Sequence, residues 1–241
     1  MRILCAFIAV FLAFASAAHS QVLIMNTAND PPNSTDDYSG ICDIVMTEAF
    51  KRIGIKLEIV NLPSERALIN ANEGIDDGNY ARIEGLEKTY PNLIRVPEEI
   101  TRFEFSAFSK NVHFKPTGWD SLAPYNVGII TGWKILETNI TNAKSLTQVK
   151  DETLLFNLLA ADRVDVVVYE RMQGKYFLNN SGMKNIVVLI PPLTVKSMYP
   201  YLHKKHKELV PKLAEALKSM KKDGTYAKIV DGVLKSLSLK K

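Results

Sequence analysis

An arginine at the end of a short apolar segment is the residue best suited to bind a ligand. Ser64 is the expected N-cap of a short helix that ends at Gly74, and residues 75–80 are typical of a short strand, so Arg82 falls just past that strand. Ligands of open α/β sheets gather at the carboxyl ends of strands, where a planar guanidinium can bind a carboxylate through two parallel hydrogen bonds. We therefore expect Arg82 to hold an anion, with a surface ion pair to Glu84 or Glu87 as the alternative.

Arg66, near the start of the same helix, is a second candidate for contact with an anion. Two arginines at one cleft would favour an acidic ligand or a ligand with two carboxylates. An ion pair between Arg66 and a neighbouring acidic side chain is the alternative interpretation.

Motifs for catalysis or metal binding are missing from the sequence. It contains no G-x-S-x-G, no H-E-x-x-H and no phosphate-binding loop. His203 and His206 lie three residues apart, but the lysines beside them disfavour a bound metal ion. We expect no catalytic residue, no metal site and no cofactor.

The first twenty residues have the pattern of a secretory signal peptide. Arg2 precedes the apolar run 3–15, and small residues at Ala18 and Ser20 mark a cleavage site after Ser20. The run is short for a membrane span, which needs about 20 apolar residues. We expect an exported mature protein in which Cys42, left without a partner once Cys5 is removed, is a buried small apolar residue.

Composition and charge indicate an ordinary globular protein. The formal net charge is +4, and 46% of the residues are hydrophobic, so nucleic acid is not an expected partner. Lysines are concentrated in residues 204–241, where they could contact an anionic membrane surface or a partner protein. The alternative is that they form the solvated faces of two terminal helices.

Alternation of strand and helix patterns predicts two α/β lobes. The first lobe is expected to contain strands at 22–26 and 55–62 around a helix at 40–53. The scheme restarts in the second lobe, where residues 164–168 form a β-branched run typical of a strand buried on both faces of a parallel sheet. Further predicted elements of this lobe are strands at 125–130 and 186–190, a short helix containing Trp133, and a helix at 150–161.

Two terminal helices, at 208–222 and 226–237, have no strands of their own and must pack on a lobe already formed. If they return to the first lobe, the chain crosses between the lobes twice, near Ser109 and near Leu193. Two crossings make a hinge, and a cleft between hinged lobes can enclose a small ligand. The predicted organisation is a signal peptide at 1–20, a first lobe at 21–109 plus 194–241, and a second lobe at 110–193.

The ordered set of motifs resembles bacterial extracellular solute-binding proteins of family 3, the polar amino-acid type. The motifs are Asp30-Pro31-Pro32 after the first strand, the helix from Gly40, the run LPSERAL at 62–68, and ADRVDVVVY at 161–169. The resemblance covers essentially the whole mature chain. It implies a periplasmic, monomeric protein with two mostly parallel sheets flanked by helices, a small-molecule ligand that is an amino acid or another carboxylate, and a membrane permease or sensor as partner.

The family also implies roles for individual residues. Arg82 would clamp the α-carboxylate of the ligand, and Tyr38 would stack on the ligand. The helix-start amides of Thr131, Gly132 and Trp133 would complete the carboxylate site. A hydrophobic plug is the alternative role for the Trp133 ring.

One position departs from the family pattern. Amino-acid binders usually carry an aspartate at the end of a late strand to accept the ammonium group, whereas this chain has Tyr169 followed by Glu170. A buried ammonium group without a carboxylate would be costly, so a keto acid, an amide or a modified amino acid remain open as ligands. Some proteins of this fold are dehydratases of cyclic carboxylic acids, and Glu170 would be the acid–base residue of that alternative.

Overall fold

The computed structural model describes residues 22–28 and 30–237, so the predicted signal peptide lies outside the described residues. The α-helices are α1 (Ile41–Arg52), α2 (Ser64–Glu73), α3 (Lys134–Asn139), α4 (Glu152–Ala160), α5 (Arg171–Ser181), α6 (Val210–Lys222) and α7 (Thr225–Ser236), and the 3-10 helices are η1 (Leu86–Lys88), η2 (Trp119–Leu122) and η3 (Lys204–Leu209). The strands are β1 (Val22–Thr27), β2 (Lys56–Asn61), β3 (Gly78–Arg82), β4 (Leu93–Arg95), β5 (Thr101–Ser109), β6 (Asn126–Ile130), β7 (Ser145–Val149), β8 (Val166–Glu170), β9 (Val187–Val188) and β10 (Thr194–His203).

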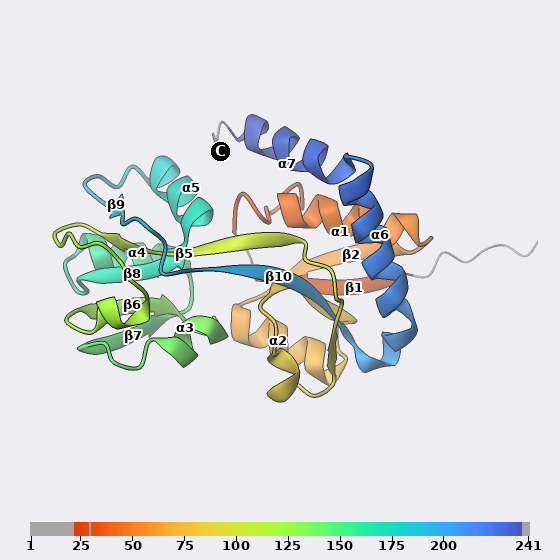
Figure 1. Cartoon of the computed structure of the whole chain (residues 1–241), viewed down its shortest axis with the longest axis horizontal. Helices are drawn as coiled ribbons and strands as arrows, with labels where there is room; N and C mark the ends of the chain where they lie inside the picture. Colours follow the sequence, from red (N-terminus) through yellow and green to blue (C-terminus); the bar gives the residue numbers. More distant parts are fainter. Residues whose placement is uncertain (1–21, 29, 238–241) are drawn as a thin grey trace, which may run out of the picture.

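The strands form two groups joined by β5 and β10. Along the sheet the order is β2-β1-β3-β10-β5-β8-β6-β7, with β4 added to β10 and β9 added to β5. Pairing is parallel within β2-β1-β3 and within β8-β6-β7, and antiparallel where β5 and β10 join them. Figure 1 shows the two long strands running side by side between the two halves of the molecule. The predicted two-lobed α/β fold is confirmed, while the exact division of the chain at residues 109 and 193 stays a prediction.

Strand β10 was not predicted, because Pro200 lies inside it and proline cannot donate to a strand ladder. The structure accommodates this residue where the register of pairing with β3 shifts, between Tyr199 and Tyr201. Strand β10 pairs with β5 as far as Met198, with β3 from Tyr199 and with β4 from Tyr201. The proline therefore lies just after the point at which β10 leaves β5 for β3.

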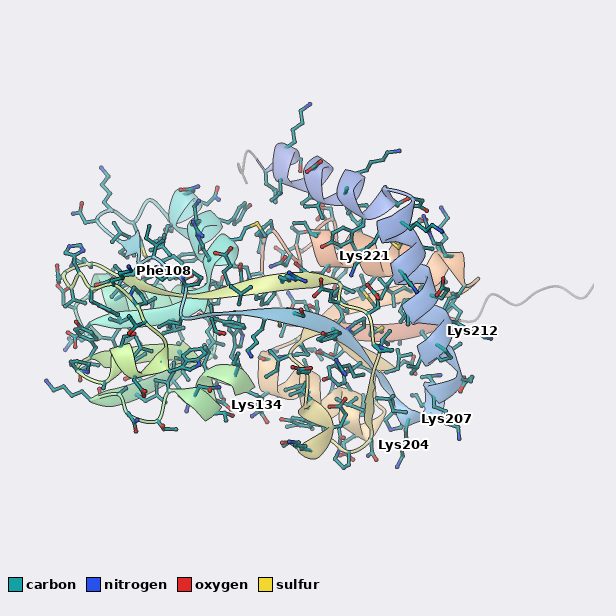
Figure 2. All side chains as sticks on the ribbon, in the orientation of Figure 1. Phe108, Lys134, Lys204, Lys207, Lys212 and Lys221 are labelled. Atoms are coloured by element: carbon teal, nitrogen blue, oxygen red, sulfur yellow. The ribbon has the colours of Figure 1, made fainter. Side chains whose placement is uncertain are left out.

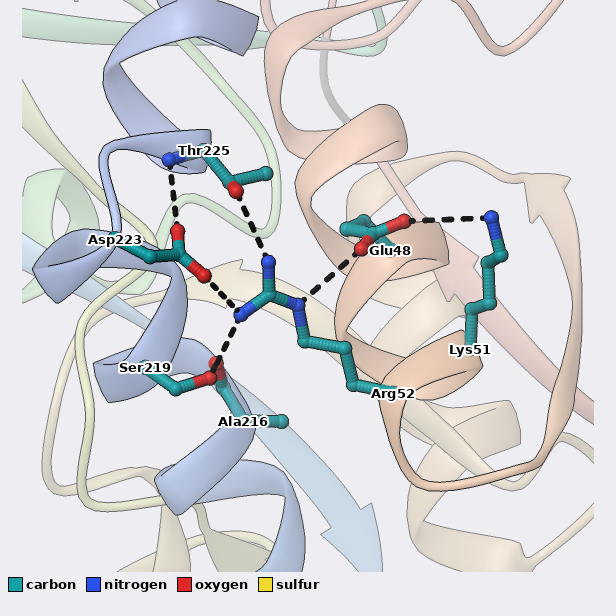
Figure 3. Close-up of polar contacts among 7 residues, drawn as sticks. All are labelled: Glu48, Lys51, Arg52, Ala216, Ser219, Asp223 and Thr225. Carbon is teal, nitrogen blue, oxygen red and sulfur yellow. Dashed lines mark hydrogen bonds and ion pairs between the residues drawn. The ribbon is translucent and has the colours of Figure 1, made fainter.

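The C-terminal helices α6 and α7 pack against α1 of the first lobe (Figure 1). Arg52, in the last turn of α1, reaches this helical pair and donates hydrogen bonds to Ser219, Asp223 and Thr225 (Figure 3). The lysines along η3 and α6 include the exposed residues Lys204, Lys207 and Lys212 (Figure 2). Their exposure agrees with the solvated-face interpretation of the basic C-terminal segment.

The core is continuous through both lobes, and Cys42 is fully buried in it, as predicted. No helix in the described part of the chain has the length and apolarity needed to cross a membrane.

Candidate functional site

Arg82 is the last residue of β3 and does not lie past its end, because the strand runs from Gly78 to Arg82 and not over residues 75–80. All five residues of this strand are buried, and Arg82 is 9% exposed. Its Nε donates to Asn79 Oδ1 at 2.5 Å, and its Nη1 and Nη2 donate to Ser64 Oγ at 2.7 Å and to the Ser64 carbonyl at 3.1 Å. The partners of this guanidinium are therefore neutral groups.

The charge of Arg82 is retained despite its burial. Burial lowers the pKa of Arg82 to about 10, which leaves the side chain cationic at neutral pH. The predicted alternative, a surface ion pair with Glu84 or Glu87, is wrong because both acids lie near Arg95, at 3.6 and 3.9 Å. Among the described residues Arg82 has no ion-pair partner within 4.0 Å, so the buried cation is well placed to receive an anion.

A network of polar side chains orients Arg82. Asn79 accepts from Arg82 and donates to the carbonyl of Asn26 at 3.1 Å. Asn26 in turn donates to Asp76 Oδ2 at 2.6 Å and to the Ala67 carbonyl at 2.9 Å. The sequence carries no local signal for this network, because Asn26 and Asn79 meet only when β1 pairs with β3.

Ser64 has a different role from the predicted helix cap. The residue at the N-cap position of α2 is Pro63, and Ser64 is the first residue of the helix. Its hydroxyl accepts from Arg82 and donates to the carbonyl of Gly132 at 3.1 Å, on the second lobe. Ser64 therefore links the candidate anion site to the opposite lobe.

The two lobes are in direct contact beside Arg82. Lys134 lies at the start of α3 (Figure 2). Its Nζ is 2.5 Å from Glu65 of α2 and 3.0 Å from Glu137. Burial lowers the pKa of Lys134, but the hydrogen bonds to Glu65 and Glu137 outweigh it and the net shift is upward. This ion pair fastens α2 of the first lobe to α3 of the second.

Gly132 and Trp133 line the same hollow as Arg82. The backbone amides of Thr131, Gly132 and Trp133, which were expected to bind the ligand carboxylate, instead donate to other groups of the protein. The amide of Thr131 donates to the Val149 carbonyl at 2.8 Å, and that of Gly132 donates to Glu137 Oε1 at 2.6 Å. The amide of Trp133 donates to the carbonyl at residue 130, at 3.3 Å. Helix α3 starts only at Lys134, and the three amides bond to acceptors within the second lobe.

Trp133 is packed between the lobes and is 8% exposed. Its ring stacks on Tyr169 with centroids 4.8 Å apart and meets Phe105 edge-on at 5.9 Å. Trp133 and Arg82 both line a small apolar hollow with room for about 30 Å³, which is close to the volume of one water molecule. Little space is therefore left between Arg82 and the indole.

A larger cavity of about 370 Å³ adjoins this hollow and shares Ala28 and Trp133 with it. We call it the interlobe cavity; its polar lining residues are Asp30, Asn61, Ser64, Lys150, Asp151 and Glu152. Its volume lies within the range of about 300–1,000 Å³ that is usual for small-molecule sites. Ser64 lines this cavity and also contacts Arg82, so the two hollows form one candidate site.

Tyr169 occupies the position where the family would place an aspartate, and the structure supplies a carboxylate from elsewhere. The fully buried Tyr169 hydroxyl donates to Asp30 Oδ2, which comes from the loop after β1 on the first lobe. Burial, followed by repulsion from Glu152, raises the pKa of Asp30 to about 7. Asp30 belongs to a motif noted in the sequence, but its partner Tyr169 lies 139 positions further along the chain, so no local pattern indicated that the two residues meet.

Glu170 is buried and serves as the cap of α5. Its Oε2 accepts from the Gln173 amide at 2.7 Å, and burial raises its pKa to about 7. It is not among the residues lining the small hollow or the interlobe cavity. The Glu170 carboxylate therefore stabilises the start of α5.

The remaining predicted site residues lie on the surface. Tyr38 is 38% exposed, and Arg66 and Thr131 are also exposed. None of the three lines the small hollow or the interlobe cavity. Of the predicted residues, Arg82, Gly132 and Trp133 line the small hollow, and Tyr169 reaches them by stacking on Trp133.

Comparison with known proteins defines the fold of the chain. No model of a protein family matches the sequence. An uncharacterized protein from Shewanella oneidensis is 27% identical over 194 residues, which cover 76% of this chain and 72% of that protein. An amino acid ABC transporter substrate-binding protein from Streptococcus pneumoniae, solved with L-arginine bound, aligns with a TM-score of 0.73 at 17% identity, covering 91% of this chain and 97% of that one.

A second solved structure is a histidine kinase sensor domain described as similar to periplasmic binding proteins. It aligns with a TM-score of 0.77 at 17% identity, covering 89% of this chain and 95% of that domain. The chain has the periplasmic-binding-protein fold. The predicted resemblance to solute-binding protein family 3 is thus confirmed at the level of the fold.

Proposed function

We propose that this protein is a solute receptor that closes on a small polar carboxylate, an amino acid or a related acid. The observation that carries the proposal is the buried, charged guanidinium of Arg82, whose hydrogen-bond partners are all neutral. A carboxylate that replaced part of this neutral shell would form charge-assisted hydrogen bonds in a site of low dielectric. Approach to Arg82 requires the Trp133 ring to move or the lobes to part, as in a hinged receptor.

Closure of the lobes is the output of such a receptor. The contacts that hold the closed form include Glu65 with Lys134, Ser64 with Gly132, and Asp30 with Tyr169. A ligand shifts the population only by its differential affinity for the closed state. The closed form would present both lobes in a fixed arrangement to a membrane permease or a sensor; solved structures of this fold include an ABC transporter substrate-binding protein and a histidine kinase sensor domain.

The receptor is proposed to act in the periplasm as a monomer, without a cofactor and without turnover of its ligand. The support for binding without turnover is the position of Glu170, whose carboxylate caps α5. If the protein were a dehydratase, a cleft-bound acid would be consumed, and Glu170→Gln would abolish that consumption while preserving binding. Chromatography of each bound acid after incubation with the mature protein tests this point.

A thermal-shift screen of the mature protein tests the ligand class. The panel contains amino acids, their keto and hydroxy counterparts, dicarboxylates and cyclic acids. A ligand at 100 times its dissociation constant should stabilise the fold by about 2.7 kcal/mol, which raises the melting temperature by several degrees. A panel in which no carboxylate shifts the melting temperature would contradict the proposal.

Arg82→Ala then tests the residue. We expect a loss of about 2–5 kcal/mol in binding, the usual effect of truncating one partner of a buried charge pair. Arg66→Ala is the matched control, because Arg66 is an exposed arginine on the adjacent helix. Circular dichroism of both variants separates loss of binding from loss of folding, and Arg82→Lys provides a second variant that keeps the charge. A folded Arg82→Ala protein with affinity within about threefold of the parent would overturn the assignment.

A further inference from the structure

A third cavity, of about 250 Å³, continues the interlobe cavity beyond Asp30 and Glu152. We call it the α5 cavity; it is lined by Asp30 and Glu152, which the two cavities share, and by Gln173, Tyr176, Phe177 and Asn180. The arginine site, the interlobe cavity and the α5 cavity therefore follow one another, each sharing residues with the next. A ligand with its carboxylate at Arg82 can extend toward Asp30 and Glu152.

We call the place where the two cavities meet, at Asp30 and Glu152, the border. Beside it, the side chain of Gln173 carries a buried acceptor that has no donor. Its side chain is 1% exposed, and its Nε2 donates to the backbone carbonyl of Asp30 at 3.2 Å. That contact fixes the orientation of the amide, because only the nitrogen can donate. The Oε1 atom is left buried with no hydrogen-bond partner in the described part of the protein. Buried acceptors are rarely left unpaired, so this oxygen indicates that a donor binds here.

The two carboxylates at the border also lack a cation. Asp30 has the Tyr169 hydroxyl as its side-chain partner, and the basic residue nearest in sequence to Glu152, Lys150, lies 3.6 Å from Asp151. No ion pair within 4.0 Å involves Asp30 or Glu152 among the residues that the structure describes. No lysine or arginine lines the α5 cavity.

Electrostatics at the border agree with this geometry. Burial and then repulsion from Glu152 raise the pKa of Asp30, and burial is the largest cause of the raised pKa of Glu152. Both shifts mean that the negative charges are poorly compensated by the protein itself. The aromatic rings of Tyr176 and Phe177 at the same cavity can add favourable contacts to a cation.

We propose that the border formed by Asp30, Glu152 and the Gln173 oxygen is a subsite for an ammonium or guanidinium group carried by the ligand. The inference rests on the proposed carboxylate site at Arg82 and narrows its ligand to a zwitterion with separated charges. Asp30 of the loop after β1, Glu152 of α4 and Gln173 of α5 all line the α5 cavity. The cation would thus be bound by residues of both lobes, and its binding would favour closure.

Isothermal titration with three matched series of compounds tests the subsite. The first series runs from glycine to 6-aminohexanoate and includes L-lysine and L-arginine, the second has the same acids without the amine, and the third has the amines without the acid. We expect one length of aminocarboxylate to bind at least about tenfold more tightly than its matched acid and its matched amine. Equal binding of an aminocarboxylate and its matched acid, or binding of no aminocarboxylate, would overturn the subsite.

Glu152→Gln assigns the effect to the border. The ratio of the affinities for the best aminocarboxylate and its matched acid should fall by about tenfold or more in this variant. Glu215→Gln, which removes an exposed acid from α6, is the control and should leave the ratio unchanged. Gln173→Met, which removes the unpaired oxygen with little change in size, should lower the same ratio and provides a second variant if the first is unstable. An unchanged ratio in folded Glu152→Gln and Gln173→Met would refute the subsite.

The two proposals fail separately in this design. Loss of the subsite leaves binding of simple acids dependent on Arg82. Equal binding of an amine and its matched aminocarboxylate would instead overturn the carboxylate site at Arg82.

Discussion

The backbones of the two lobes approach each other closely at Gly132, and Gly132→Ala should impair closure. A Cβ atom built on Gly132 would lie 2.6 Å from the backbone nitrogen of Glu65 and 3.0 Å from its Cα. Non-bonded heavy atoms normally stay about 3.5–4.0 Å apart, and the atoms in the way are backbone atoms that cannot rotate aside. The lobes must therefore separate near Ser64, whose hydroxyl donates to the Gly132 carbonyl.

The expected loss has two parts that can be separated. Gly132 has φ of +85°, a left-handed backbone conformation that strains an alanine whether the lobes are open or closed. This strain should cost about 1–2 kcal/mol in the stability of the fold. The steric contact affects only the closed form, where overpacking of this kind costs about 1–3 kcal/mol. Ligand affinity should consequently fall by about 5- to 150-fold.

Gly182→Ala is the matched control for this variant. Gly182 has φ of +70°, and a Cβ atom there would meet nothing within 4 Å, so it shares the backbone strain without the steric contact. Chemical denaturation should show similar losses of stability in the two variants. Calorimetry with the strongest carboxylate from the screen should show weaker binding only for Gly132→Ala.

Small-angle scattering provides an independent measure of closure. At saturating ligand, the radius of gyration of Gly132→Ala should remain above that of the parent and of Gly182→Ala. Identical affinities and identical scattering for the two glycine variants would refute the reasoning that close backbone approach at Gly132 is needed for closure.

Two further predictions concern stability. Gly174→Ala should cost about 1–3 kcal/mol in denaturant unfolding, because its Cβ would lie 2.4 Å from the Phe108 ring, whereas Gly232→Ala, in the open on α7, should stabilise by about 0.5–1 kcal/mol; equal effects would contradict this. Hydrogen bonds from Thr225 and then from Arg52 lower the pKa of Asp223 from 3.8 to about 2 (Figure 3). The carboxylate therefore stabilises the fold above pH 3.8 and loses this contribution as pH falls toward 2. Urea titrations of Asp223→Asn should show a deficit at pH 7 that shrinks over this acid range, and a constant deficit would argue against it.

Much of the architecture could be predicted because the elements have strong local signals. The helix that became α2 ends at Gly74 with φ of +72°, as its position predicted, and β1, β6 and β8 fall within a few residues of their expected bounds. Elements α5 and β10 were missed because Gly174 and Pro200 interrupt their patterns. Both interruptions have tertiary causes, since Gly174 lies against Phe108 and Pro200 lies at the register shift of β10.

The sequence by itself determined the alternation of most strands and helices, the two-lobed fold and the choice of Arg82 as an anion-binding candidate, because apolar periodicity and residue type are local properties. Only the tertiary structure decided which groups meet Arg82 and which do not. Ser64 and Asn79 reach it through helix and strand packing, while Asp30 meets Tyr169 across the lobes. Such contacts join residues far apart in the chain, and their energies depend on burial and on the absence of competing partners, which no local pattern encodes.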